Sequence, residues 1–269
     1  MSTKLNKGIA ALTLSTVACL GAVSSVSADI GPVLGFEADQ LGAAGVSAVN
    51  NEAITDQFAG LYGVEFSIVD PFTMNTMDAL PLLTQVGANF DGTYPNHDDG
   101  FLSQINDTFD EARPGFEDEL GGWFLRTKSP IDANPGSLLM TMTDGPVNYV
   151  TGQIWDIDGD LAEAAGVAVG TEQWRVVALD SDGFEIDAIV SPIGDSPDPD
   201  VNPYESAPWN WAFDHAENDI FAVRIDFIGT REAGAGLGFD NFSTVPTPGV
   251  ASLLGLGALM TAKRRRRNA

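Results

Sequence analysis

Cysteine and histidine are scarce in this chain of 269 residues, and the motifs of common catalytic sites are missing. Its one cysteine, Cys19, lies in an N-terminal segment that is expected to be removed, so the body that remains has no disulfide. A body of about 215 residues buries enough apolar surface to fold without one. The sequence has no Gly-x-Ser-x-Gly elbow, no His-Glu-x-x-His pattern and no Gly-x-x-x-x-Gly-Lys loop. His97 and His215 lie in acidic surroundings and are expected to be solvated, so no enzyme is indicated.

Positive charge is also scarce, because 13 Lys and Arg stand against 38 Asp and Glu. Seven of the basic residues lie before residue 29 or after residue 245, whereas all the acidic residues lie between these positions. The formal charge of the body is therefore 6 − 38 = −32. Such a surface repels nucleic acid, which is excluded as a partner, and it attracts divalent cations. Secretion into a salty medium is the first explanation of this charge.

The first 28 residues have the layout of a secretory signal peptide. Lys4 and Lys7 precede an apolar run over residues 8–23, and small residues lead to a cleavage site after Ala28. We therefore expect the secretion machinery to export the chain and the mature body to begin at Asp29.

The last 24 residues form an apolar and then basic tail. A Pro-Thr-Pro-Gly motif is followed by thirteen mostly apolar residues, 250–262, then by Lys263 and four arginines. Thirteen helical residues span about 20 Å, short of the roughly 30 Å hydrocarbon core of a bilayer. The tail is expected to associate with a membrane transiently, with its arginines on the cytoplasmic side. A plain C-terminal membrane anchor is the alternative.

This tail resembles the PEP-CTERM class of bacterial sorting signals, with Pro-Thr-Pro-Gly in place of the usual Pro-Glu-Pro. The resemblance implies that an exosortase-type membrane enzyme cleaves the chain near the proline motif. It also implies that the body is released or attached outside, at the cell envelope, the cell surface or the extracellular matrix. The residues expected to direct processing at both ends are Ala28, Pro246, Thr247, Pro248, Gly249, Arg264, Arg265, Arg266 and Arg267.

The body, residues 29–245, has no linker or repeat and is expected to be one domain. Short alternating runs bounded by Gly, Asn and Asp predict an all-β fold, a single β-sandwich. An acidic excursion over 70–120 is expected to contain a helical turn within Met74–Val86 and a helix at Phe101–Ala112. The expected strands are Val33–Glu37, Ile54–Phe58, Val64–Ser67, Ser137–Thr143, Val147–Trp155, Gln173–Leu179, Phe184–Val190, Trp209–Phe213, Ile220–Ile228 and Leu237–Val245, with a hairpin turn at Asp180–Gly183.

The body resembles jelly-roll, galactose-binding-like and carbohydrate-binding modules. The resemblance rests on Ile54–Ser67, Val150–Asp158, Val176–Gly183 and the closing Gly238–Asn241. It implies a non-catalytic module that binds a glycan or serves a structural role.

Calcium is the cofactor that suits such an acidic body, because hard cations bind carboxylate and carbonyl oxygens. The segment Asp156–Asp160 begins like an EF-hand loop, but Gly159 and Val167 occupy positions that this loop does not allow, so a solvated turn is expected. In modules similar to this body, a structural calcium lies between the first and last strands. Glu37 and Asp240 occupy those places here, with hydrogen bonding at strand ends as the alternative.

An aromatic strand is the candidate glycan-binding surface. Trp209, Trp211 and Phe213 share one face of an extended segment, with Tyr204 nearby. An exposed row of this kind would stack on sugar rings, whereas a buried row would belong to the sandwich core. Exposure of these side chains distinguishes the two.

The sequence thus predicts a secreted, non-catalytic envelope or matrix protein that binds an exopolysaccharide or has a structural role. The alternative is a glycan-active hydrolase or lyase on the same sandwich. That alternative requires two carboxylates about 5 to 9.5 Å apart in a cleft. The sequence does not select such a pair from the 38 acidic residues.

Overall fold

The computed structural model describes residues 32–86, 113–127, 136–157, 170–195, 200–204, 206–230 and 238–245. Several of the predicted features lie outside these residues: the signal peptide, the sorting tail, the helix at 101–112 and the second half of the turn at 156–160.

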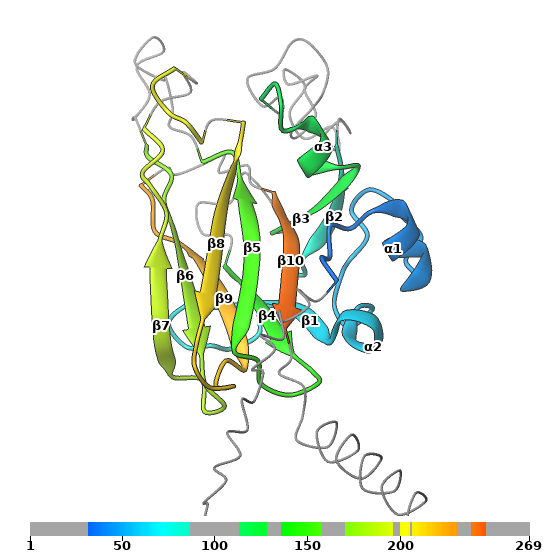
Figure 1. The fold of residues 1–269 in the computed structure, drawn as a ribbon, viewed down its shortest axis with the longest axis vertical. Helices are drawn as coiled ribbons and strands as arrows, with labels where there is room; N and C mark the ends of the chain where they lie inside the picture. Colours follow the sequence, from blue (N-terminus) through cyan, green and yellow to red (C-terminus); the bar gives the residue numbers. More distant parts are fainter. Residues whose placement is uncertain are drawn as a thin grey trace, which may run out of the picture.

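Two antiparallel sheets of five strands each pack face to face, which confirms the predicted β-sandwich. In Figure 1, β8, β5 and β10 lie in the nearer layer, and β7, β6, β9 and β4 in the layer behind. The first sheet has the order β1-β4-β9-β6-β7 and the second has the order β2-β3-β10-β5-β8. Their bounds are β1 (Val64–Val69), β2 (Leu82–Gln85), β3 (Trp123–Arg126), β4 (Ser137–Met142), β5 (Tyr149–Trp155), β6 (Trp174–Leu179), β7 (Glu185–Val190), β8 (Pro208–Asp214), β9 (Ala222–Phe227) and β10 (Phe239–Val245).

The predicted opening strand at Val33–Glu37 is wrong. Only Leu34 pairs, through two backbone hydrogen bonds with Phe242 of 2.7 and 3.0 Å. The side-chain carbonyl of Gln40 then accepts the N–H of Glu37 at 3.1 Å, so the chain turns into a helix instead of continuing along the sheet. Among the described residues, the short helices are α1 (Ala38–Ala43), α2 (Ala59–Tyr62) and α3 (Glu117–Leu120).

The segment Met74–Val86 contains a strand, β2, where a helical turn was expected. Pro81 directly precedes β2, and a proline disfavours the helical conformation in the residue before it. Leu83 is fully buried in the core between the sheets, and it pairs with Leu125 of β3. The predicted acidic excursion therefore returns to the sandwich and supplies an edge strand of the second sheet.

The core follows the alternation of the strands. In β9, Val223 and Ile225 are buried between the sheets, whereas Arg224 and Asp226 face outward, as the sequence predicts. Each such buried aliphatic side chain contributes about 1.5–3 kcal/mol to folding. A smaller core of Leu120, Phe124 and Trp155 lies apart from it.

None of the helices within the described residues is long and apolar enough to cross a membrane.

Candidate functional site

The aromatic residues of β8 pack against the core of the sandwich. Trp211 and Phe213 are each 2% exposed, and the half-buried Trp209 and Tyr204 pack against the same core. Gly152 lies opposite Trp211 on β5, where any Cβ would collide with the indole ring, so the space for this ring is built into the neighbouring strand. The interpretation of these side chains as a glycan-stacking surface is therefore wrong for Trp211.

The structure brings Glu37 and Asp240 together. The pairing of Leu34 with Phe242 places the chain before α1 beside β10. A carboxylate oxygen of Glu37 accepts the backbone N–H of Gly122 at 3.3 Å, which holds this side chain beside the start of β3. Glu37 lies close enough to raise the pKa of Asp240 through its charge.

Asp240 has a buried carboxylate that is only half satisfied. Its side chain is 1% exposed, and its Oδ1 accepts the backbone N–H of Asn241 at 2.7 Å. Its Oδ2 accepts no hydrogen bond within the part of the chain that the structure describes. Burial, followed by the charge of Glu37, raises the pKa of this carboxyl well above its ordinary value, against the opposing effect of the Asn241 hydrogen bond. A buried carboxylate oxygen without a partner is costly, and a cation would offset that cost.

Asn241, the residue after Asp240, is held by hydrogen bonds to two other segments. Its amide nitrogen donates to the backbone carbonyl of Glu119 at 2.9 Å and to the side-chain carbonyl of Gln153 at 2.7 Å. With both amide hydrogens used, Oδ1 faces Gly35 and lies 2.8 Å from the position of a Cβ there. Asn241 has φ +53° within the bulge of β10, a conformation that asparagine tolerates better than most residues.

Glycines leave the room that these oxygens occupy. A Cβ at Gly121 would overlap the carboxylate of Glu37, and one at Gly35 would press on Asn241. Gly121 also has φ +63°, which favours glycine on backbone grounds. Glycine at these two positions thus leaves room for the Glu37 carboxylate at Gly121 and for the Asn241 side chain at Gly35.

Two carboxylates and an amide oxygen are hard ligands of the kind that calcium prefers. Within the described ranges, no group of three or more His, Cys, Asp or Glu side chains is arranged to hold a metal ion. Calcium at this place would therefore need backbone carbonyls and water to complete six to eight ligands, as flexible calcium sites commonly do. Glu37 and Asp240 are the side chains that would hold a calcium ion here, and Asn241 is adjacent to Asp240 in the chain. Sequence reasoning missed Asn241, although it directly follows Asp240.

Asp156, the described start of the expected solvated turn, is buried instead. Its side chain is 4% exposed and accepts the backbone N–H of Ser206 at 3.1 Å. Asp156 also has φ +62°, so the residue ends β5 in a left-handed conformation. The carboxylate holds two chain segments together, and this contact is the physical reason that the prediction is wrong for this residue.

His215 lies between two carboxylates and is not simply solvated. Its Nδ1 lies 2.7 Å from Asp219 and its Nε2 lies 3.4 Å from Asp187, and its side chain is 16% exposed. The two carboxylates approach opposite ring nitrogens, so the three groups form a chain of ion pairs and do not converge on one point. His97 lies outside the described residues.

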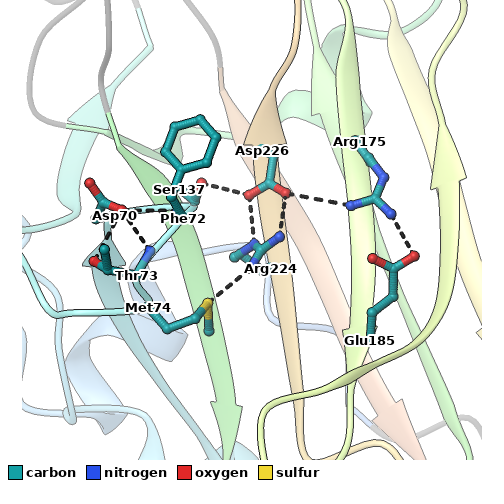
Figure 2. Close-up of polar contacts among 9 residues, drawn as sticks. All are labelled: Asp70, Phe72, Thr73, Met74, Ser137, Arg175, Glu185, Arg224 and Asp226. Atoms are coloured by element: carbon teal, nitrogen blue, oxygen red, sulfur yellow. Dashed lines mark hydrogen bonds and ion pairs between the residues drawn. The ribbon is translucent and has the colours of Figure 1, made fainter.

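The outer face of the first sheet carries a charged network that sequence analysis did not identify (Figure 2). Arg224 donates from Nε and Nη2 to the two carboxylate oxygens of Asp226 at 2.7 and 2.8 Å. Ser137 donates to Asp226 at 2.6 Å, and Arg175 lies 3.9 Å from it. Arg175 also pairs with Glu185 at 2.5 Å, so the network crosses from β4 to β7.

No family model and no curated protein matches the chain. Among solved structures, the chain is similar to the enzymatically active domain of tailspike protein 4 of bacteriophage CBA120, with 11% sequence identity and a TM-score of 0.28. The match covers 73% of this chain and 22% of that structure, so the chain spans about a fifth of its length. A TM-score of 0.28 supports no inference about a shared activity.

Proposed function

We propose that the chain is an exported, non-catalytic protein of the cell envelope or extracellular matrix. Its β-sandwich contacts a polysaccharide or has a structural role, and a calcium ion closes the sandwich between the segment before α1 and β10. Export uses the N-terminal signal and the sorting tail described above, and an exosortase-type enzyme is the processing partner.

The observation that carries this proposal is the placement of Glu37 and Asp240. The two carboxylates lie near each other, and Asp240 is only 1% exposed, so a polysaccharide does not reach it. A hydrolase needs its carboxylates on opposite sides of an accessible glycosidic bond. A buried Asp240 carboxylate near the half-buried carboxylate of Glu37 suits a structural cation instead.

The cation supplies positive charge where the fold has gathered negative charge. It links residue 37 to residues 240 and 241, which are joined otherwise by the Leu34–Phe242 pairing nearby. In a body with 38 acidic residues, it also relieves repulsion locally. An ion at 100 times its Kd stabilises the fold by about 2.7 kcal/mol.

Thermal unfolding in calcium and in magnesium at matched ionic strength tests the site. Magnesium is the control because it keeps its water and requires octahedral geometry. Calcium should raise the melting temperature further than magnesium does, and Glu37→Gln or Asp240→Asn should abolish the difference. Asp226→Asn changes a buried aspartate elsewhere and should lower both melting temperatures while preserving the difference. Equal shifts from both ions in the unaltered protein would rule out the calcium site.

Intact-mass measurement of the exported protein tests the proposed export and cleavage at both ends. The mature species should begin at Asp29 and lack the residues after Pro248. A mature species that retains Arg264–Arg267 would identify the tail as an anchor. Release of reducing sugar ends from a polysaccharide by the purified protein would contradict the non-catalytic assignment.

A further inference from the structure

Phe72 has the most exposed large apolar side chain of the described residues, at 89%. It lies in the turn between β1 and β2, which Figure 2 places beside the charged network of the first sheet. We propose that Phe72 and this network form a binding site for a neutral polysaccharide, in which a pyranose ring stacks on the phenyl ring. The inference rests on the proposed function and deepens it, because it names the glycan site and the class of ligand.

Hydrogen bonds fix the backbone of the turn at Phe72 before any ligand arrives. Asp70 Oδ1 accepts three hydrogen bonds: from the N–H of Phe72 at 2.9 Å, from the N–H of Thr73 at 2.8 Å and from the Thr73 hydroxyl at 3.1 Å. These bonds, with the Thr73 N–H first, lower the pKa of Asp70, so the carboxylate that organises the turn stays charged in neutral solution. A backbone that is already ordered loses little conformational entropy on binding.

The turn is also fixed to the sheet beneath it. Met74 packs on Val177 and Leu179 of β6 and on Ala222 of β9, although the turn itself follows β1 at the other edge of the sheet. Arg224 donates to the sulfur of Met74 at 2.9 Å. The turn therefore reaches across the outer face, and Phe72 projects from it toward solvent (Figure 2).

The network offers hydrogen-bonding groups for sugar hydroxyls. Arg224 and Asp226 are held by each other, with side chains 13% and 8% exposed. Arg175 and Glu185 form the open end, with side chains 29% and 46% exposed. In Figure 2 this open end lies across the Arg224–Asp226 pair from Phe72. Its guanidinium donors and carboxylate acceptors would therefore bind hydroxyls of neighbouring sugar units in a polymer whose ring stacks on Phe72.

The charges of the network and of the body favour a neutral polysaccharide as the ligand. The network contains two arginines and two carboxylates, so it has no net charge to attract a polyanion. The rest of the body carries a formal charge of 4 − 36 = −32 and repels polyuronates. A neutral glucan or galactomannan meets no such repulsion.

A single exposed apolar side chain is common on protein surfaces, so a matched control is needed. Phe184 supplies it, because this side chain is 69% exposed at the hairpin between β6 and β7 of the same sheet. Its backbone N–H bonds to Asp180, but its side chain is outside the network of Figure 2. Both phenylalanines can be replaced by alanine with little loss of packing.

Native affinity electrophoresis through gels that contain dextran, hydroxyethyl cellulose or galactomannan tests the site, with an alginate gel as the anionic comparison. The unaltered protein should be retarded in at least one neutral gel and not by alginate. Phe72→Ala should weaken this binding about tenfold, equivalent to 1.4 kcal/mol. Phe184→Ala should leave it unchanged, and both variants should keep the melting temperature of the unaltered protein.

Retardation that survives Phe72→Ala would overturn the site and leave the proposed polysaccharide contact intact. Failure of the unaltered protein to be retarded in all three neutral gels would overturn both the site and that contact. Light scattering of the same samples supplies the remaining comparison. A dimer that dissociates in Phe72→Ala would overturn the glycan site and assign Phe72 to contact between two copies.

Discussion

Asp187 in β7 and His215 directly after β8 connect the edges of the two sheets, with 3.4 Å between the aspartate Oδ2 and the histidine Nε2. Asp219 approaches the other ring nitrogen at 2.7 Å. Burial alone lowers the pKa of His215, but the hydrogen bonds and charges of Asp219 and Asp187 outweigh it and raise this pKa above 6.5. The fold thus favours the charged imidazolium at the side of the sandwich where both sheets end.

The pH dependence of stability should report this contact. A histidine whose pKa is raised in the folded state stabilises fully below its unfolded pKa of about 6.5, and this contribution disappears as the pH rises through the folded pKa. Since Asp187 and Asp219 are half exposed, the contribution is on the order of 1 kcal/mol or less. Urea unfolding between pH 6 and pH 9 should show it, and His215→Gln should remove it. His97→Gln is the control, and a profile that changes only in this control would contradict the assignment.

Asp226 should be the least replaceable member of the charged network. It is 6% exposed and accepts from Ser137 and from two nitrogens of Arg224. Asp226→Asn leaves Arg224 without its counter-charge on a partly buried face, so the free energy of unfolding should fall by about 1–3 kcal/mol. Glu185→Gln, at the exposed end, should cost about 1 kcal/mol or less. Urea unfolding measures both variants. Equal losses of unfolding free energy would show that the difference in burial between Asp226 and Glu185 does not determine their contributions to stability.

The sequence predicted the elements whose pattern is local. β9 alternates Val223, Arg224, Ile225 and Asp226, and this period of two fixes both the strand and its buried face. The hairpin at Asp180–Gly183 is confirmed between β6 and β7, because the turn chemistry lies within four residues. These features required no knowledge of distant parts of the chain.

Features set by distant segments were not predictable in the same way. Alternation showed that Trp209 and Trp211 share a face, but burial of that face depends on β5, where Gly152 makes room for the Trp211 ring. The strand β3 was missed, since four residues following α3 and Gly121 carry too short a pattern. The proximity of Glu37 and Asp240 came from a resemblance. The contacts of Asn241 with Glu119 and Gln153 join distant segments and are encoded by no spacing.

The hairpin glycine should matter for backbone reasons alone. Gly183 has φ +80°, and no atom lies within 4 Å of the place that a Cβ would take, so a side chain meets strain but no collision. Gly183→Val should lower the free energy of unfolding by about 1–3 kcal/mol, because a β-branched residue disfavours positive φ. Gly183→Asn should cost less, since asparagine tolerates this region better. Equal thermal stability of the valine variant and the unaltered protein would contradict the turn geometry.

The effect of Asp240→Asn on the free energy of unfolding should have opposite signs with and without calcium. In a chelator, the substitution removes a buried carboxylate whose Oδ2 accepts no hydrogen bond from the described residues, while the new amide oxygen can still accept the N–H of Asn241. Because the new amide nitrogen takes the place of Oδ2, the gain comes from removing a buried negative charge near Glu37 and not from removing a polar group. The free energy of unfolding should then stay equal or rise by about 1–3 kcal/mol. In saturating calcium, the same variant should be less stable than the unaltered protein, because it loses a charged ligand. Urea unfolding of both proteins, in chelator and in calcium, measures this reversal. Destabilisation of equal size with and without calcium would mean that Asp240 serves only as a hydrogen-bond acceptor for β10.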